Sequence, residues 1–386
     1  MLKESFFIDA TDDVVELYNK YTDSIIKKMA YEIKALAKLD DIGRQANLVM
    51  SANGIYNDMI SKLSKLTRYS EKEIKSILKN AGVETLKYDD TIYRNAGFNP
   101  APISQSPELL QIMEGIGNNT NAILENLPRT SANATSNLFL NTLNEAHLQV
   151  TSGALDYNTA IKGAVKKLAT YGTIITYPTG VNAQLDVMVR RAVLTSVKDV
   201  SNQVQVKRAE EFDAPFADTS AHSGARPTHT EWQGKRFCLK GSKTDGTGKY
   251  LNFYTDNFGK ANKPVFEQLK EPNCRHSWYP VMFDDEEKAY NEKEIAELNS
   301  QKVADNKGNV YTTYEAEQKL RSMERTVRKY RRQAEALKIV GMDSSFELAK
   351  AEKWELEIAN FVKATRLQRR RFNEKVFYTA NEMDWR

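Results

Sequence analysis

The sequence predicts a mainly α-helical protein with a small central α+β domain, a helical N-terminal region and a C-terminal helical hairpin. Long runs with apolar residues at helical spacing occupy residues 1–152. Short β-branched and aromatic segments, separated by Gly and Pro, appear within 153–285. Charged helical segments around one short turn fill 286–386. We therefore expect three parts with these boundaries, since 386 residues exceed one ordinary core.

The N-terminal region is expected to be all-helical. Ser70 and Glu73 have the spacing of a capping box, and Gly82 is typical of a helix end, so a separate short helix is predicted between them. A proline-rich loop at 95–107 ends with Ser106-Pro107, a pattern that begins a helix. The other predicted helices are Asp12–Leu39, Asp41–Leu66, Pro107–Leu127 and Ser131–Thr151.

The central region alternates helix and strand signals, which is typical of a small α+β domain. Asp156 is expected to cap a helix that runs through Ala169, with Gly172 after its end. A second helix is expected to begin near Asn182. The predicted strands are Thr173–Tyr177, Lys235–Leu239 and Lys249–Tyr254, and the glycine-rich segment 241–248 is predicted to be a hairpin turn.

The C-terminal region is predicted to be a pair of long helices around a turn at Gly341, the second running from Ser345 to about Val376. The first helix is strongly basic. We expect Arg325, Arg328 and Arg332 to form a contact face for an acidic protein surface or for DNA phosphates. The alternative is an ordinary solvated helix face.

Composition excludes several classes of protein. A net charge of +4 over 386 residues is too small for a chain coated with nucleic acid, so any such contact would be local. No apolar run is long enough for a membrane span, and two cysteines do not make a disulfide framework. The sequence has no P-loop, dinucleotide fingerprint or G-x-S-x-G motif. We therefore predict no catalytic residues, no enzyme activity and no organic cofactor.

Rare residue types gather in the stretch 219–280, which holds three of the four histidines, both cysteines and two of the four tryptophans. Cys274 and His276 are two apart, so on a strand they would share a face and could bind one ion. The candidate zinc ligands are His222, His229, Cys238, Cys274 and His276. The alternative is that histidines bond loop carbonyls while Trp232 and Trp278 fill a small core. A His-Asn-His nuclease would use the same residues, but it needs a helix after the metal-binding strand, and the sequence after His276 does not predict one.

Two segments of this stretch resemble signatures of the tailed-phage minor capsid protein 2 family. They are A-H-S-G-A-R-P-T-H-T-E-W-Q-G-K at 221–235 and N-C-R-H-S-W-Y-P at 273–280. R-R-A-V-L-T-S-V at 190–197 is similar to the helix that precedes the first signature, while 266–273 departs from the family's glycine-rich lead-in. The motif residues carried by the resemblance are Arg226, Trp232, Gln233, Gly234 and Trp278.

The resemblance implies a minor structural protein of a phage head, related to Mu F-type head morphogenesis proteins. Its expected partners are the portal protein and other head proteins, with packaged DNA as a further candidate and no membrane. It would be oligomeric within the particle, located in the virion and in the host cytoplasm during assembly. The alternative function is a metal-dependent nucleic-acid-binding protein or nuclease acting in genome packaging.

Overall fold

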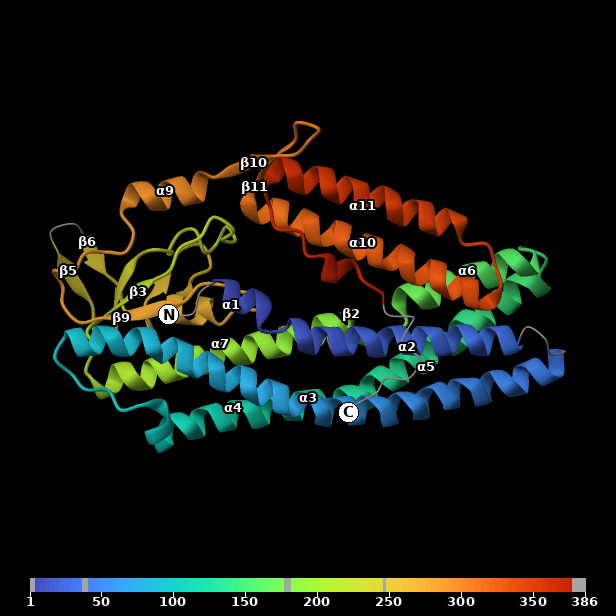
Figure 1. The fold of residues 1–386 in the computed structure, drawn as a ribbon, viewed down its shortest axis with the longest axis horizontal. Coiled ribbons are helices and arrows are strands. Elements are labelled where there is room, and N and C mark those ends of the chain that lie inside the picture. The colour runs from blue at the N-terminus through green and yellow to red at the C-terminus, as the bar shows by residue number, and fades with distance from the viewer. Residues whose placement is uncertain (1–3, 37–40, 177–181, 246–247, 377–386) are drawn as a thin grey trace.

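The computed structural model describes residues 4–36, 41–176, 182–245 and 248–376. Long helices form an extended body, and a strand-rich module lies at one end of it (Figure 1). Helices dominate and every sheet is small and antiparallel, so the predicted fold class is confirmed. None of the described helices is both long enough and apolar enough to cross a membrane.

The N-terminal region consists of helices, as predicted. Its elements are α1 (Glu4–Asp9), α2 (Asp12–Leu36), α3 (Asp41–Asn95), the 3-10 turn η1 (Ile103–Gln105), α4 (Pro107–Glu125) and α5 (Leu127–Thr151). Ser106 caps α4 by accepting a hydrogen bond from the backbone N–H of Leu109, with Pro107 in the first turn. The predicted end of α2 at Leu39 lies outside the described residues.

The predicted separate helix between Ser70 and Gly82 is wrong, because α3 continues unbroken for 55 residues. Ser70 is buried and its hydroxyl donates back to the carbonyl of Thr67, so it is an interior helical residue and not a cap. Gly82 does not end the helix. A Cβ there would lie 2.7 Å from Met113 Sδ and 3.4 Å from Val200 Cγ1, so glycine permits close helix packing.

Two further helices complete the main hydrophobic core. They are α6 (Tyr157–Tyr171) and α7 (Leu185–Glu211), joined through the hairpin of β1 (Ile174–Thr176) and β2 (Asn182–Gln184). Asp156 caps α6 as predicted, whereas α7 begins three residues after Asn182. Val189, Val193 and Val197 of α7 pack with α2 and α3 in one core. This core continues across residue 153, while the predicted domain boundaries stay a prediction.

The module at the end of the molecule, residues 214–281, is called the hub from here on. Its strands are β3 (Phe216–Thr219), β4 (Arg236–Cys238), β5 (Lys243–Asp245), β6 (Gly248–Tyr250), β7 (Asn257–Phe258), β8 (Lys263–Pro264) and β9 (Trp278–Val281), with one short helix, α8 (Val265–Leu269). The main sheet has the order β4-β3-β9, all antiparallel, and α8 packs against it. Strands therefore form within both predicted segments, 235–239 and 249–254. β5 and β6 make the predicted hairpin, whose tip, 246–247, lies outside the described residues.

The C-terminal region contains the predicted helix pair. Its elements are α9 (Glu292–Ser300), β10 (Lys302–Ala304), β11 (Val310–Thr312), α10 (Thr313–Val340), α11 (Ser345–Thr365) and η2 (Arg371–Glu374). Gly341 ends α10 in the left-handed conformation, with φ of 79°. The predicted end of α11 near Val376 is wrong. Arg366 adopts φ of 58°, and the chain turns back so that Asn373 bonds Glu324 of α10 at 2.8 Å.

Two buried ion pairs join α10 to the helical body. Arg332 donates to Asp23 of α2 at 2.7 Å, and Arg328 donates to Asp186 of α7 at 2.9 Å. All four side chains are buried. Burial favours the neutral acid, but the two guanidinium groups outweigh it and lower the pKa of Asp186. Breaking such a pair leaves one charge buried without compensation.

We predict that Gly82→Val lowers the free energy of unfolding by about 1–3 kcal/mol, because the added methyl groups overpack the contact with α4 and α7. Gly54→Val is the matched control in the same helix, since no atom lies within 4 Å of a Cβ at that position. Urea unfolding of both variants provides the measurement. Equal losses of stability would contradict this account of Gly82.

We predict that Arg332→Gln costs about 3–5 kcal/mol of folding stability, because Asp23 keeps its charge in the core without a full partner. Arg325→Gln, on the exposed side of the same helix, should change stability by less than about 0.5 kcal/mol. Chemical unfolding followed by circular dichroism measures both. A small effect at Arg332 would show that the ion pair is not needed to hold α10.

Candidate functional site

The two signature segments form adjoining loops in the hub. Successive turns shape the first loop, in which the His229 backbone N–H donates to Arg226 at 2.8 Å and that of Gln233 donates to His229 at 3.0 Å. The second loop leads from α8 into β9 and carries Cys274 and His276. The backbone N–H of Ser220 donates to the carbonyl of Ser277 at 2.8 Å, which fixes the loops side by side.

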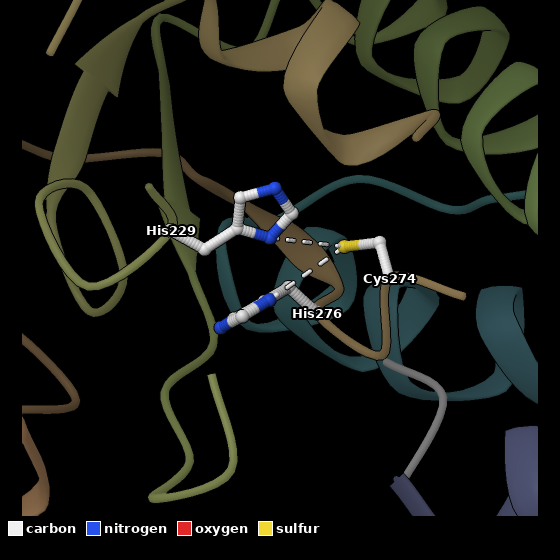
Figure 2. Close-up of side chains that lie close together, drawn as sticks. All are labelled: His229, Cys274 and His276. Carbon is white, nitrogen blue, oxygen red and sulfur yellow. Dashed lines mark hydrogen bonds between the residues drawn. The ribbon is translucent and has the colours of Figure 1, made fainter. Parts of the chain in front are cut away.

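Three side chains from these loops converge on one point. Figure 2 shows His229, Cys274 and His276 pointing toward one another. The sulfur of Cys274 lies 3.7 Å from Nδ1 of His229 and 3.6 Å from Nδ1 of His276. All three residues are buried, with 1% of each histidine and 8% of the cysteine exposed. Sulfur and imidazole nitrogen are ligands that Zn²⁺ prefers.

The other nitrogen of each imidazole has its own partner. Nε2 of His229 lies 3.4 Å from a carboxylate oxygen of Glu271, which also accepts from Arg226 at 2.9 Å. Nε2 of His276 lies 2.9 Å from Oε1 of Gln233. A histidine that binds a metal through one ring nitrogen commonly donates its other ring N–H to a carboxylate or carbonyl oxygen. The ring orientations are therefore fixed from outside the cluster.

The structure brings three of the five predicted zinc ligands together and leaves the other two outside this group. His222 lies beside the cluster, with its ring stacked on that of His276 at 4.2 Å between centroids. Cys238 lies elsewhere, on β4, where it packs with the apolar side chains of Phe216 and Val281. Of the predicted set, only His229, Cys274 and His276 form a compact group of ligand atoms among the described residues. Cys274 and His276 lie close together, but in the loop before β9 and not on a strand, and metal binding by the pair stays a prediction.

Burial keeps the two histidines of the cluster and the neighbouring His222 neutral. It lowers the pKa of His222 and of His229 to about 3 and the pKa of His276 well below its usual range. Nearby cations act in the same direction, namely Arg226, Arg275 and Lys198. The His229–Glu271 contact is therefore a hydrogen bond of a neutral imidazole.

The motif residues carried by the resemblance all shape this site. Trp232 and Trp278 are fully buried, and the Trp232 indole donates to Gln268 at 2.9 Å. Gln233 connects both loops, and Arg226 holds the second loop through Glu271 and the carbonyl of Pro272. Gly234 has φ of 71°, and a Cβ there would lie 2.9 Å from Ile295. Their shared role is to build the loops.

Several contributing residues were not predicted from the sequence. Glu271 and Gln268 lie in the segment that departs from the family pattern, yet they contact His229 and Trp232. Arg275, between the two ligands, points the other way and pairs with Glu317 of α10 at 2.6 Å. Side chains alternate in an extended segment, so the position of Arg275 between Cys274 and His276 could have predicted that it points away from both. Nothing in the sequence distinguishes Glu271 among the 51 acidic residues as a partner of His229.

The predicted basic contact face requires a correction. Arg328 and Arg332 are buried in ion pairs with the helical body, so they do not present charge to a partner. Arg325 is exposed as expected. The exposed basic side of α10 consists instead of Arg321, Arg325 and Lys329, which are spaced by four residues and are called the basic stripe below.

The neutral histidines predict acid sensitivity. An unfolded histidine has a pKa near 6.5, above the folded values, so the unfolded chain binds more protons as the pH falls from about 6.5. Stability should therefore decrease as the pH falls below about 6.5, and the slope for each histidine should approach about 1.4 kcal/mol per pH unit near pH 5. In chelator-treated protein, His222→Gln should reduce the mean slope of the unfolding free energy between pH 6.5 and 5 by about 1 kcal/mol per pH unit. His147→Gln on α5 is the control for the substitution, and an unchanged slope in His222→Gln would contradict the prediction.

Comparison with known proteins extends the resemblance of the two signature loops to most of the chain. The family model described as Phage minor capsid protein 2 matches residues 2–363. No curated protein and no solved structure matches the chain. The matched range includes the helical body, the hub and both helices of the C-terminal hairpin almost to the end of α11. The chain therefore belongs to the phage minor capsid protein 2 family.

Proposed function

We propose that this minor capsid protein acts in head assembly next to the portal, as a non-catalytic interaction protein that is oligomeric within the particle. The observation that carries the proposal is the family match over residues 2–363. Other proteins of the phage head are the partners that membership implies. Location in the virion follows from the same membership, and the host cytoplasm is the proposed site of assembly.

The burial of reactive groups supports a structural role. A nuclease or hydrolase must bring its general base or nucleophile within about 3 Å of the reacting atom of a substrate. His229, Cys274 and His276 are at most 8% exposed, and their outward-facing atoms already contact Glu271 and Gln233. A phosphodiester could not reach them without opening the hub. This burial disfavours the nuclease alternative.

The basic stripe is the surface we propose for contact with a partner. Arg325 and Lys329 are exposed on α10, next to the exposed Arg321. Guanidinium and ammonium groups at four-residue spacing on one helix face complement an acidic protein surface or a row of phosphates. The buried pairs of Arg328 and Arg332 hold α10 to the body, so the stripe is presented from a fixed helix.

Mass spectrometry of purified heads should detect this protein in few copies per particle, and crosslinking should connect it to the portal protein. Arg325→Glu with Lys329→Glu should reduce its copy number, because the stripe would then repel an acidic partner. Lys72→Glu with Lys79→Glu, also exposed but on α3, is the matched control.

The stage at which copies are lost identifies the partner. A loss already present in procapsids, before DNA enters, indicates a protein partner for the basic stripe. A loss confined to filled heads indicates DNA. Absence of the wild-type protein from both procapsids and filled heads would refute the proposed function.

A further inference from the structure

We infer that His229, Cys274 and His276 form a structural binding site for one divalent transition metal ion, with Zn²⁺ as the best match. The ligand atoms are Nδ1 of each histidine and the sulfur of Cys274. The ion would join the two signature loops as a clip within the hub. This inference goes beyond the proposed function and does not depend on it.

The positions of protons in the cluster lead to this inference. A carboxylate oxygen only accepts hydrogen bonds, so Nε2 of His229 must donate to Glu271. The Gln233 oxygen is identified by the His222 backbone N–H that it accepts at 3.0 Å, so Nε2 of His276 must donate to it. A neutral imidazole carries one N–H. Both Nδ1 atoms therefore direct lone pairs at Cys274.

One thiol proton cannot satisfy both nitrogens. If Cys274 donates to one Nδ1, the other faces sulfur across 3.6–3.7 Å with no hydrogen between them. A thiolate would be worse, since three lone pairs would then converge in a buried site. Lys198 does not supply the missing proton, because its ammonium makes no hydrogen bond with any described residue and lies over the Phe7 ring. A cation bound by all three atoms removes the conflict.

The distances match a tetrahedral metal. With Zn–S near 2.3 Å and Zn–N near 2.0 Å, a tetrahedral angle separates sulfur from nitrogen by about 3.5 Å. The two observed separations are 3.6 and 3.7 Å, and all three ligand atoms lie within 4.8 Å of one another. One sulfur and two imidazole nitrogens are typical of zinc and atypical of Mg²⁺ or Ca²⁺, which prefer oxygen.

The charged groups around the cluster are mostly paired. Arg226 pairs with Glu271, and Arg275 pairs with Glu317. Lys198 is buried and lines the same small cavity as Cys274, and its ammonium has no hydrogen-bond partner among the described residues. The negative charge of a metal-bound Cys274 thiolate would offset part of the Lys198 charge. We therefore infer three protein ligands, His229, Cys274 and His276.

Metal analysis of the full-length protein, purified without chelator, should find about one zinc ion per chain. Cobalt titration of the metal-free protein should give a thiolate-to-cobalt charge-transfer band, and Cys274→Ser should abolish it. Cys238→Ser is the matched control and should keep the band, because Cys238 lies outside the cluster. Glu271→Gln should weaken zinc affinity about 10–100-fold, measured by competition with a chelator, because Glu271 holds the outer nitrogen of His229 and is not itself a ligand.

Circular dichroism of each variant separates loss of metal from loss of fold. If Cys274→Ser does not fold, His229→Gln and the affinity of Glu271→Gln provide the test. Wild-type protein that is folded yet binds no zinc and gives no cobalt band would overturn the inference. A band lost in Cys238→Ser and kept in Cys274→Ser would overturn it as well.

Discussion

The side-chain amide of Gln233 connects three separate parts of the chain, and the geometry of the hub depends on it. Its oxygen accepts from the backbone of His222 and from the ring of His276, at 3.0 and 2.9 Å, while its nitrogen donates to Asn299 of α9 at 2.6 Å. The residue is fully buried, so each of these bonds replaces one that water would otherwise make. Because the amide can satisfy these partners in only one orientation, it determines which nitrogen of His276 carries the proton. The arrangement of Cys274 and both histidine lone pairs follows from that choice.

Hydrogen bonds of a buried amide and ion pairs of arginine side chains also hold the hub to the helices. Gln205 of α7 donates to the carbonyl of Trp278 at 2.5 Å and to Asp89 of α3 at 2.8 Å, which attaches β9 to two long helices. Arg275 extends from the second signature loop to Glu317 of α10. The same helix is tied to α2 and α7 by Arg332 and Arg328. Polar groups that lie between elements therefore fix how hub, hairpin and body are placed, because an apolar contact alone is not directional.

Sequence patterns predicted the features that depend on neighbouring residues. Asp156 caps a helix and Gly341 ends one, since both act on backbone groups within a few positions. Predictions failed where a distant residue decides. Gly82 fits the sequence pattern of a helix end, but glycine is needed there because Met113 and Val200, which are distant in sequence, pack closely against it. Arg332 resembles a surface charge, but its partner Asp23 lies 309 positions away. Likewise, Cys274 and His276 are neighbours in sequence and lie close in space, whereas the position of Cys238 away from them depends on where β4 lies in the sheet.

A cluster of histidine and cysteine has the same composition whether it catalyses a reaction or binds a structural metal, so accessibility must distinguish the two. Both roles require neutral imidazoles held by outer hydrogen bonds, and His229 and His276 have them. Catalysis also requires a path for substrate, and these side chains are 1% exposed. A site that is oriented and closed fits a protein whose partners bind elsewhere. Contact with any partner must therefore be made by exposed side chains, such as that of Arg325 on α10.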